Sequence, residues 1–185
     1  MLIKYLYWDL MNSSSRNDYL YAIVRNMPGR LGFEMRKLLM QKRLKSVGSN
    51  IRIHMGCRLV NPQNLVVGNN VHFGVDSYLQ AGGGISIGDF TEMGPGVKIW
   101  SQNHIYDDPD KNIEGAGYEL KPVQIGNNVW IGASAFIMPG TIIEDGCVIS
   151  ACSVVGAKVW PMNSIISGNP ARKIGERGIL RTQSS

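Results

Sequence analysis

Residues 125–155 read IGNNVWIGASAFIMPGTIIEDGCVISACSVV. In this stretch an aliphatic residue recurs at every sixth position: Ile125, Ile131, Ile137, Ile143, Ile149 and Val155. A small or branched residue follows each of them by four positions: Val129, Ala135, Thr141, Cys147, Ser153 and Val159. A helix spaces its apolar residues by about 3.6 positions and a half-buried strand by two, so neither explains this period. The period predicts a solenoid in which each hexad supplies one short strand and one turn.

The same period continues upstream in two blocks: Val67, Phe73 and Leu79, then Ile87, Met93 and Ile99. The blocks are 20 residues apart, which is three hexads and two further residues. We expect each inward aliphatic side chain to stack on the one 18 positions later, one coil on. Glycine accounts for 22 of 185 residues, and pairs such as Gly88-Asp89 suit turns with unusual backbone angles.

The first quarter of the chain has a helical pattern instead. Apolar residues follow helical spacing in residues 19–27 and 31–39, and Pro28-Gly29 separates these two segments. Ser15 and Asp18 resemble a capping box at the start of the first segment, and residues 1–11 predict a further short helix. The expected organisation is a helical segment over residues 1–48, a mainly β solenoid domain over 49–175 and a tail over 176–185.

The excess positive charge lies in the helical quarter. Residues 1–45 hold nine basic and three acidic residues, whereas the remaining 140 carry ten basic and eleven acidic ones. A basic amphipathic segment favours either peripheral contact with an anionic membrane surface or a solvated helix face. The nearly neutral body and the lack of an aromatic platform argue against a nucleic-acid partner.

The composition also places the chain in a broad class. Hydrophobic residues make up 44% and charged residues 18%, which excludes global disorder. No apolar stretch is long enough to span a membrane, and the start lacks the features of a secretory signal. Three cysteines form neither a disulfide framework nor a spaced metal motif. We expect a cytoplasmic protein, with residues 1–45 suited to the inner face of the membrane.

The repeat is interrupted between Ile99 and Ile125. Residues 105–122, IYDDPDKNIEGAGYELKP, are polar and contain two prolines, which predicts a loop extruded from the solenoid. His104 stands where the coil ends and this loop begins. An imidazole titrates near neutral pH, so it suits a general base that takes a proton from a hydroxyl group and returns it to a leaving group.

At this point the chain resembles the hexapeptide-repeat acetyltransferases. The resemblance rests on residues 125–155 and on SGNPARKIG at 167–175, and it covers roughly residues 50–175. It is similar to the galactoside and maltose O-acetyltransferase branch and to the capsule and O-antigen O-acetyltransferases. The resemblance implies a left-handed parallel β-helix, a homotrimer with active sites between subunits, and acetyl-CoA as the acyl donor.

The resemblance also implies the roles of individual residues. His104, in the pair Asn103-His104, matches the catalytic base of the family, and Asp76 and Asn103 are the expected acceptor contacts. The galactoside branch carries an asparagine in the stretch that matches Asp76, so this chain departs from it there. The backbone N–H of Ala133 is the expected oxyanion donor.

The expected coenzyme A groove follows the later coils. Its residues, with the indole along the pantetheine arm, are Trp130, Gly132, Ala133, Ala151, Gly156, Ala157, Lys158 and Arg172. Lys158 and Arg172 are the expected phosphate contacts. The family often has Thr-Lys where this chain has Gly156-Ala157, which leaves the phosphate-binding cation undefined.

The expected function is acetyl-CoA-dependent O-acetylation of a saccharide or lipid-linked saccharide, as in polysaccharide biosynthesis. Three alternatives stay open: an N-acetyltransferase of an amino sugar or nucleotide sugar, an antibiotic acetyltransferase, and a non-catalytic trimeric scaffold or metal-binding protein. The chain has only three histidines, and the spacing of His54, His72 and His104 does not suit a three-histidine metal site, so we expect no metal.

Overall fold

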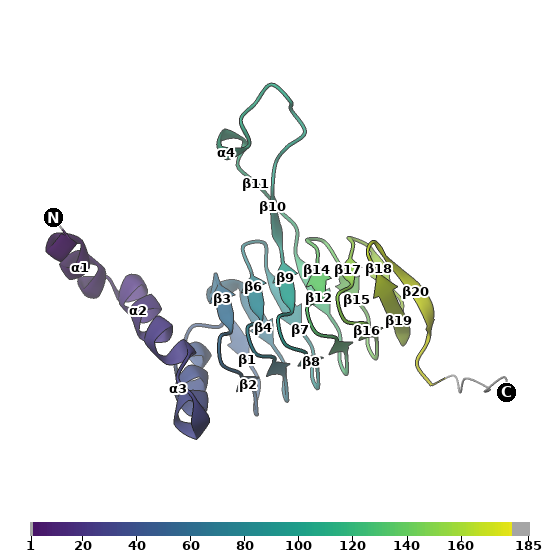
Figure 1. Cartoon of the computed structure of the whole chain (residues 1–185), viewed down its shortest axis with the longest axis horizontal. Coiled ribbons are helices and arrows are strands. Elements are labelled where there is room, and N and C mark those ends of the chain that lie inside the picture. The colour runs from purple at the N-terminus through teal and green to yellow at the C-terminus, as the bar shows by residue number, and fades with distance from the viewer. Residues whose placement is uncertain (1, 179–185) are drawn as a thin grey trace.

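The computed structural model describes residues 2–178, without the side chains of residues 2, 6 and 13–17. Three helices lead into a solenoid: α1 (Leu2–Met11), α2 (Ser13–Arg25) and α3 (Gly29–Gln41) (Figure 1). Because α2 already begins at Ser13, the capping box predicted at Ser15 is wrong. In residues 2–178 we find no helix that is both long and apolar enough to cross a membrane.

The solenoid has three faces, each a sheet of short parallel strands. The first, sheet A, contains β1 (Ser46–Val47), β4 (Leu65–Val67), β7 (Ile85–Ile87), β12 (Val123–Ile125), β15 (Ile142–Ile143) and β18 (Val159–Trp160). Sheet B contains β2 (Arg52–Ile53), β5 (His72–Phe73), β8 (Glu92–Met93), β13 (Trp130–Ile131), β16 (Val148–Ile149), β19 (Ser164–Gly168) and β20 (Ala171–Glu176). Sheet C contains β3 (Arg58–Val60), β6 (Tyr78–Gln80), β9 (Lys98–Trp100), β14 (Phe136–Ile137) and β17 (Val154–Val155).

The predicted stacking distance of 18 residues is correct only in the C-terminal half. There Ile125 pairs with Ile143. In the N-terminal half Val67 pairs with Ile87, a coil of 20 residues. The two extra residues lie between sheet C and the next strand of sheet A, where the first coil forms the short helix η1 (Pro62–Asn64). His72 therefore stacks beside Arg52, and the predicted stacking of His54 on His72 is wrong.

The inward hexad positions form one continuous core. The six aliphatic residues that define the repeat from Ile125 to Val155 are at most 3% exposed. Burying such a side chain contributes about 1.5–3 kcal/mol each. The repeated core explains why the hexad pattern predicts the architecture so well.

Close coil-to-coil approach explains the Gly-Asn and Gly-Asp pairs. At the edge between sheets A and B, Asn69 N donates to Asp89 Oδ1 at 2.7 Å, and Asp89 N donates to Asn127 Oδ1 at 2.8 Å. A Cβ atom added to Gly68 would lie 2.8 Å from Asp89 N, which is too close. Glycine is thus required for the side-chain ladder of this edge to form.

The helices are joined to the solenoid through Arg36 of α3. Its side chain is 2% exposed, and its nitrogens donate to four carbonyl oxygens, those of Val24, Arg25, Met27 and Ile53. Three of these carbonyls belong to the end of α2 and the turn after it, where a positive charge is favourable. Arg36 is therefore part of the fold and does not belong to the exposed positive charge of the N-terminal quarter.

The C-terminus also differs from the prediction. Strand β20 folds back antiparallel onto β19, with Ser167 opposite Arg172. The chain therefore stays in a sheet as far as Glu176, one residue into the predicted tail. The rest of that predicted tail, from residue 179, lies outside the described residues.

Candidate active site

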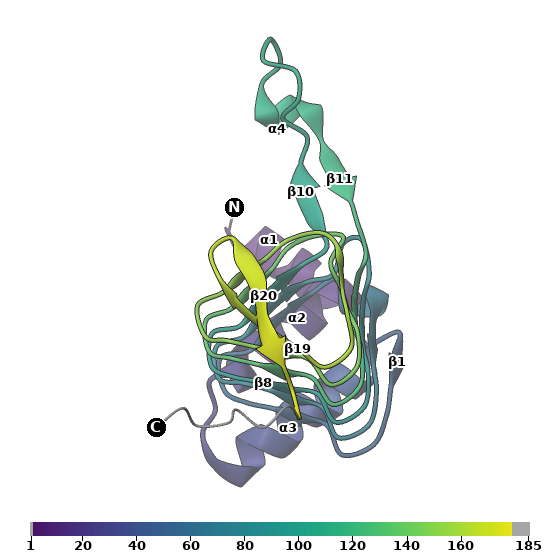
Figure 2. The ribbon, with the colours of Figure 1, turned by 90° about the vertical axis from the view of Figure 1, so that its right-hand side faces the viewer.

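The predicted loop leaves the solenoid at the edge between sheets C and A. It begins with β10 (Gln102–His104) and returns through α4 (Ile113–Ala116) and β11 (Tyr118–Leu120), and the hairpin projects far from the coils (Figures 1 and 2). The two strands pair antiparallel, so His104 lies opposite Tyr118. Several exposed apolar side chains lie along this loop: Ile105, Tyr106, Ile113, Tyr118 and Leu120.

His104 is held at the base of this hairpin. Its ring centroid lies 4.4 Å from that of Tyr118, with the ring planes 41° apart. Asn103 Oδ1 accepts a hydrogen bond from the backbone N–H of His104 at 3.0 Å. The imidazole is exposed, and within residues 2–178 no carboxylate lies within 4.0 Å of it. Asn103 thus orients the backbone of His104, and the ring is free to exchange a proton with a bound ligand.

Ala133 lies at another edge, between sheets B and C. Its carbonyl accepts from Cys152 N at 2.9 Å. Its backbone N–H donates to no residue of the part of the chain that the structure describes. A free N–H at a turn can stabilise a developing negative charge on a ligand oxygen.

Gly132 and Ala151 flank Ala133 along the same edge. A Cβ atom added to Gly132 would lie 2.5 Å from Ala151 N, so the packing of neighbouring coils already requires glycine there. Ala151 is exposed, and no side chain of the described chain covers it. The edge therefore presents backbone and small side chains to solvent, as a groove for a ligand needs.

Asp76 lies on the same edge, two coils earlier. Its φ is +56°, and its backbone N–H donates to Met55 O at 3.0 Å. It lines a cavity together with Arg58 and Lys98. The left-handed conformation at Asp76 is one that aspartate tolerates better than most residues, which fits a turn.

The remaining predicted cofactor residues lie elsewhere on the surface. Gly156, Ala157 and Lys158 follow the edge between sheets C and A, above the base of the loop. Lys158 Nζ lies 4.0 Å from the ring centroid of Trp160, so its ammonium group is held against an indole. Arg172 lies in β20, and its Nη1 donates to the carbonyl of Ala171.

Trp130 lies on the outer surface of sheet B and is 57% exposed. It borders a cavity with Phe90, Glu92 and Arg177. The predicted site residues thus fall into separate groups along one chain. His104 and Asn103 lie on one edge of sheet C, whereas Ala133 and Asp76 lie on the other.

The width of sheet C separates these two edges. About five residues of extended chain lie between them, which corresponds to roughly 15 Å. Within one chain, therefore, the predicted base at His104 and the predicted oxyanion donor at Ala133 are not brought together.

An aromatic column lies between the edges, and the sequence did not single it out. On the outer surface of sheet C, Trp100 contacts Tyr78 and Phe136 edge-on, at centroid distances of 6.0 and 5.6 Å. The Trp100 Nε1 atom is buried and has no hydrogen-bond partner within residues 2–178. The available signal was that each of these residues stands directly beside an inward aliphatic one, which places it on the outer surface.

The other two histidines have local partners. His72 Nδ1 lies 3.3 Å from Glu92 Oε1, and burial lowers the pKa of His72. The His54 ring packs edge-on against Phe33 at 5.6 Å. Among the described residues, no group of three or more histidine, cysteine, aspartate or glutamate side chains is placed to hold a metal ion.

Comparison with known proteins gives two family matches. Residues 122–157 match the family described as "Bacterial transferase hexapeptide (six repeats)". Residues 64–90 match "Hexapeptide repeat of succinyl-transferase". Both matched segments lie in the coils of the solenoid.

Individual relatives agree with these matches. The galactoside O-acetyltransferase of Escherichia coli (strain K12) is 31% identical over 144 residues, which cover 77% of this chain and 69% of that protein. A solved galactoside acetyltransferase in complex with coenzyme A is 27% identical, with a TM-score of 0.77 over 87% of this chain and 78% of that chain. A maltose O-acetyltransferase from Clostridium difficile 630 is 29% identical, with a TM-score of 0.74 over 90% of each chain.

These matches confirm the predicted fold, a left-handed β-helix of hexapeptide repeats with an N-terminal helical segment and an extruded loop. They extend along most of the chain. The protein is therefore an acyltransferase, and the chain belongs to the family of hexapeptide-repeat acetyltransferases.

Proposed function

We propose that the protein transfers an acetyl group from acetyl-CoA to a hydroxyl group of a saccharide, with His104 as the general base. The observation that carries this proposal is the position of His104. It is an exposed imidazole with no acidic partner in the described chain, oriented at the base of a projecting loop. The similarity to a galactoside and a maltose O-acetyltransferase supports a sugar hydroxyl as acceptor, and a solved relative with bound coenzyme A supports the donor.

The proposed chemistry is a direct transfer. Acetyl-CoA supplies an activated acyl group as a thioester. His104 takes the proton of the attacking hydroxyl while the new C–O bond forms, and the N–H of Ala133 stabilises the negative charge on the carbonyl oxygen. His104 then returns the proton to the thiolate sulfur as the C–S bond breaks. No covalent enzyme intermediate is needed.

This chemistry requires a site shared between subunits. His104 and Ala133 lie on opposite edges of sheet C, so one active site needs His104 from one subunit and Ala133 from its neighbour. We propose a homotrimer, the cyclic arrangement in which each edge meets the other edge of the next subunit. The exposed apolar residues of the loop support this, because a neighbouring subunit would cover them.

Coenzyme A is proposed to lie along this interface. Small residues of both edges would let it approach the backbone: Gly132, Ala133, Ala151, Gly156 and Ala157. Trp130 is proposed to flank the pantetheine arm, and Lys158 and Arg172 to reach the phosphates. Peripheral membrane contact through residues 1–45 stays a prediction, to which α1 adds exposed side chains such as Ile3, Tyr7 and Trp8.

The experiment is an acceptor panel. Purified protein with acetyl-CoA is mixed with neutral sugars, amino sugars and nucleotide sugars, and free thiol release is followed with time. We expect release that depends on an acceptor hydroxyl and a product ester that mild alkali cleaves. An alkali-stable amide formed only on amino sugars would contradict O-acetylation and establish the N-acetyltransferase alternative. Absence of both thiol release and coenzyme A binding would contradict the proposal as a whole.

A further inference from the structure

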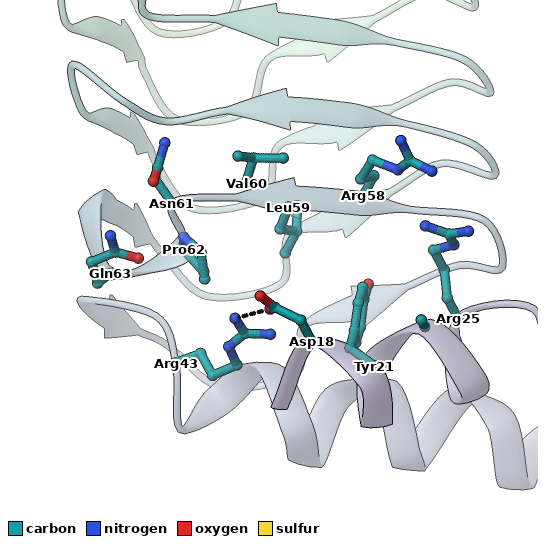
Figure 3. Close-up of a pocket in the computed structure, with 11 residues that line it drawn as sticks. Asp18, Tyr21, Arg25, Arg43, Arg58, Leu59, Val60, Asn61, Pro62 and Gln63 are labelled. Carbon is teal, nitrogen blue, oxygen red and sulfur yellow. Dashed lines mark hydrogen bonds and ion pairs between the residues drawn. The ribbon is translucent and has the colours of Figure 1, made fainter. Parts of the chain in front are cut away.

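Two adjoining cavities lie between α2 and sheet C. One, of about 350 Å³, is lined by Asp18, Arg25, Arg43 and Arg58 among others. The second, of about 330 Å³, shares Arg25 and Arg58 and also contains Asp76 and Lys98. Together they form one continuous groove, here called the arginine cleft. Figure 3 shows Arg25 of α2 and Arg58 of β3 extending into one end of it, with Asp18 and Arg43 at the other.

Three cations of the arginine cleft have no counter-charge. Arg43 Nη2 is neutralised by Asp18 Oδ1 at 2.5 Å. For Arg25, Arg58 and Lys98, no carboxylate of residues 2–178 lies within 4.0 Å. The second cavity therefore has three positive charges and one negative charge on its walls, since Asp76 also lines it. Like charges gathered on one wall attract an anion strongly.

The fold does not use these side chains. Arg36, a few ångströms of chain away, is buried and donates to four carbonyls, as expected of a structural arginine. In the described chain, the guanidinium groups of Arg25 and Arg58 make no hydrogen bond to protein. The Arg58 guanidinium lies 5.8 Å from the Tyr78 ring centroid, a contact that holds it in place without using its donors. Both arginines are available to a ligand.

We propose that the arginine cleft binds a phosphate or diphosphate group of the acceptor. Arginine presents a planar fork of donors that matches phosphate oxygens, and two such forks with a lysine suit a dianion. The inference rests on the proposed function, in which Asp76 contacts the acceptor. Asp76 lies in the same cavity as the three cations, so one ligand would place its phosphate on the cations and its sugar on Asp76. The acceptor is then a saccharide phosphate or diphosphate, not a neutral sugar.

Direct binding tests this without any turnover. Calorimetric titration of the full-length protein compares glucose, glucuronate, glucose 1-phosphate and UDP-glucose, for wild type and for Arg25→Gln, Arg58→Gln and Lys98→Gln. Arg52→Gln is the matched control, because Arg52 is an exposed arginine of the neighbouring strand β2 and lies outside the cleft. Loss of one charge-assisted contact should weaken phosphate-sugar binding about tenfold in each cleft variant, and Arg52→Gln should have no effect.

The arms of the experiment separate the outcomes. Tighter binding of UDP-glucose than of glucose 1-phosphate indicates a nucleotide sugar, and preference for a polyprenyl diphosphate saccharide in detergent indicates a lipid-linked one. Equal affinity for glucose and its phosphate, or unchanged affinity in all three cleft variants at unchanged melting temperature, would overturn the proposal. If sugar phosphates bind through the cleft but no acetyl transfer occurs, the proposed function fails and the anion site stands. If neutral sugars are acetylated and phosphates do not bind, the reverse holds.

Discussion

Replacing His104 with alanine is expected to lower the turnover of acetyl-CoA about 10²–10⁴-fold, the usual contribution of general acid–base catalysis. The reason is that nothing else at the base of the loop can take the proton of the attacking hydroxyl. The imidazole is exposed and contacts Tyr118 only through its ring, so its removal should not disturb the coils. The measurement is thiol release under saturating acetyl-CoA and acceptor, with the melting temperature recorded in parallel.

A second variant separates catalysis from loop geometry. Tyr118→Leu removes the ring contact but keeps the imidazole, and should cost far less activity than His104→Ala. If His104→Ala kept most of the wild-type turnover with its oligomeric state intact, another group would have to be the base. An equal loss in both variants would indicate that His104 acts only by shaping the hairpin.

Replacing Ala133 with proline should lower turnover about 10²–10³-fold, as does loss of one oxyanion donor in other enzymes. Proline removes the single N–H that the proposed mechanism uses. The solenoid itself shows that this turn accepts proline, because Pro95 occupies the same turn position one coil earlier. The carbonyls of both residues accept the same hydrogen bond, Ser134 N to Pro95 O at 2.8 Å and Cys152 N to Ala133 O at 2.9 Å.

The matched control is Ala133→Gly, which keeps the N–H and should retain most of the activity. Steady-state constants distinguish the causes. Loss of a donor that acts in the transition state lowers kcat, whereas a blocked groove mainly raises KM. Wild-type kcat in Ala133→Pro would remove Ala133 from the mechanism.

The sequence predicted the solenoid because its signal is repeated. Each hexad places one aliphatic residue inside, and a dozen weak signals agree. The coil length was predicted less well, since the two extra residues of each early coil lie at an edge, as in Pro62–Asn64, where no core position registers them. Arg36 shows a similar limit, because only the packing of α3 against the end of α2 reveals that this cation is buried.

The candidate site was predicted residue by residue, but not as an assembly. His104 could be singled out because it ends a coil at the start of a polar loop. Ala133 has no chemical signal of its own, and came only from resemblance to a family. That the two lie on opposite edges of sheet C depends on the order of the strands around the solenoid. The arginine cleft was also unreadable, since Arg25, Arg58 and Lys98 are far apart in the chain.

The central claim is that one active site combines His104 of one subunit with Ala133 of the next. Co-expression of His104→Ala and Ala133→Pro chains with two different affinity tags, followed by tandem purification, isolates trimers that contain both. In a cyclic trimer every such mixture holds one intact site, so we expect about one third of the wild-type turnover from two chains that are each inactive alone. Mixed trimers as inactive as either parent would contradict the account, because base and oxyanion donor would then have to come from the same chain.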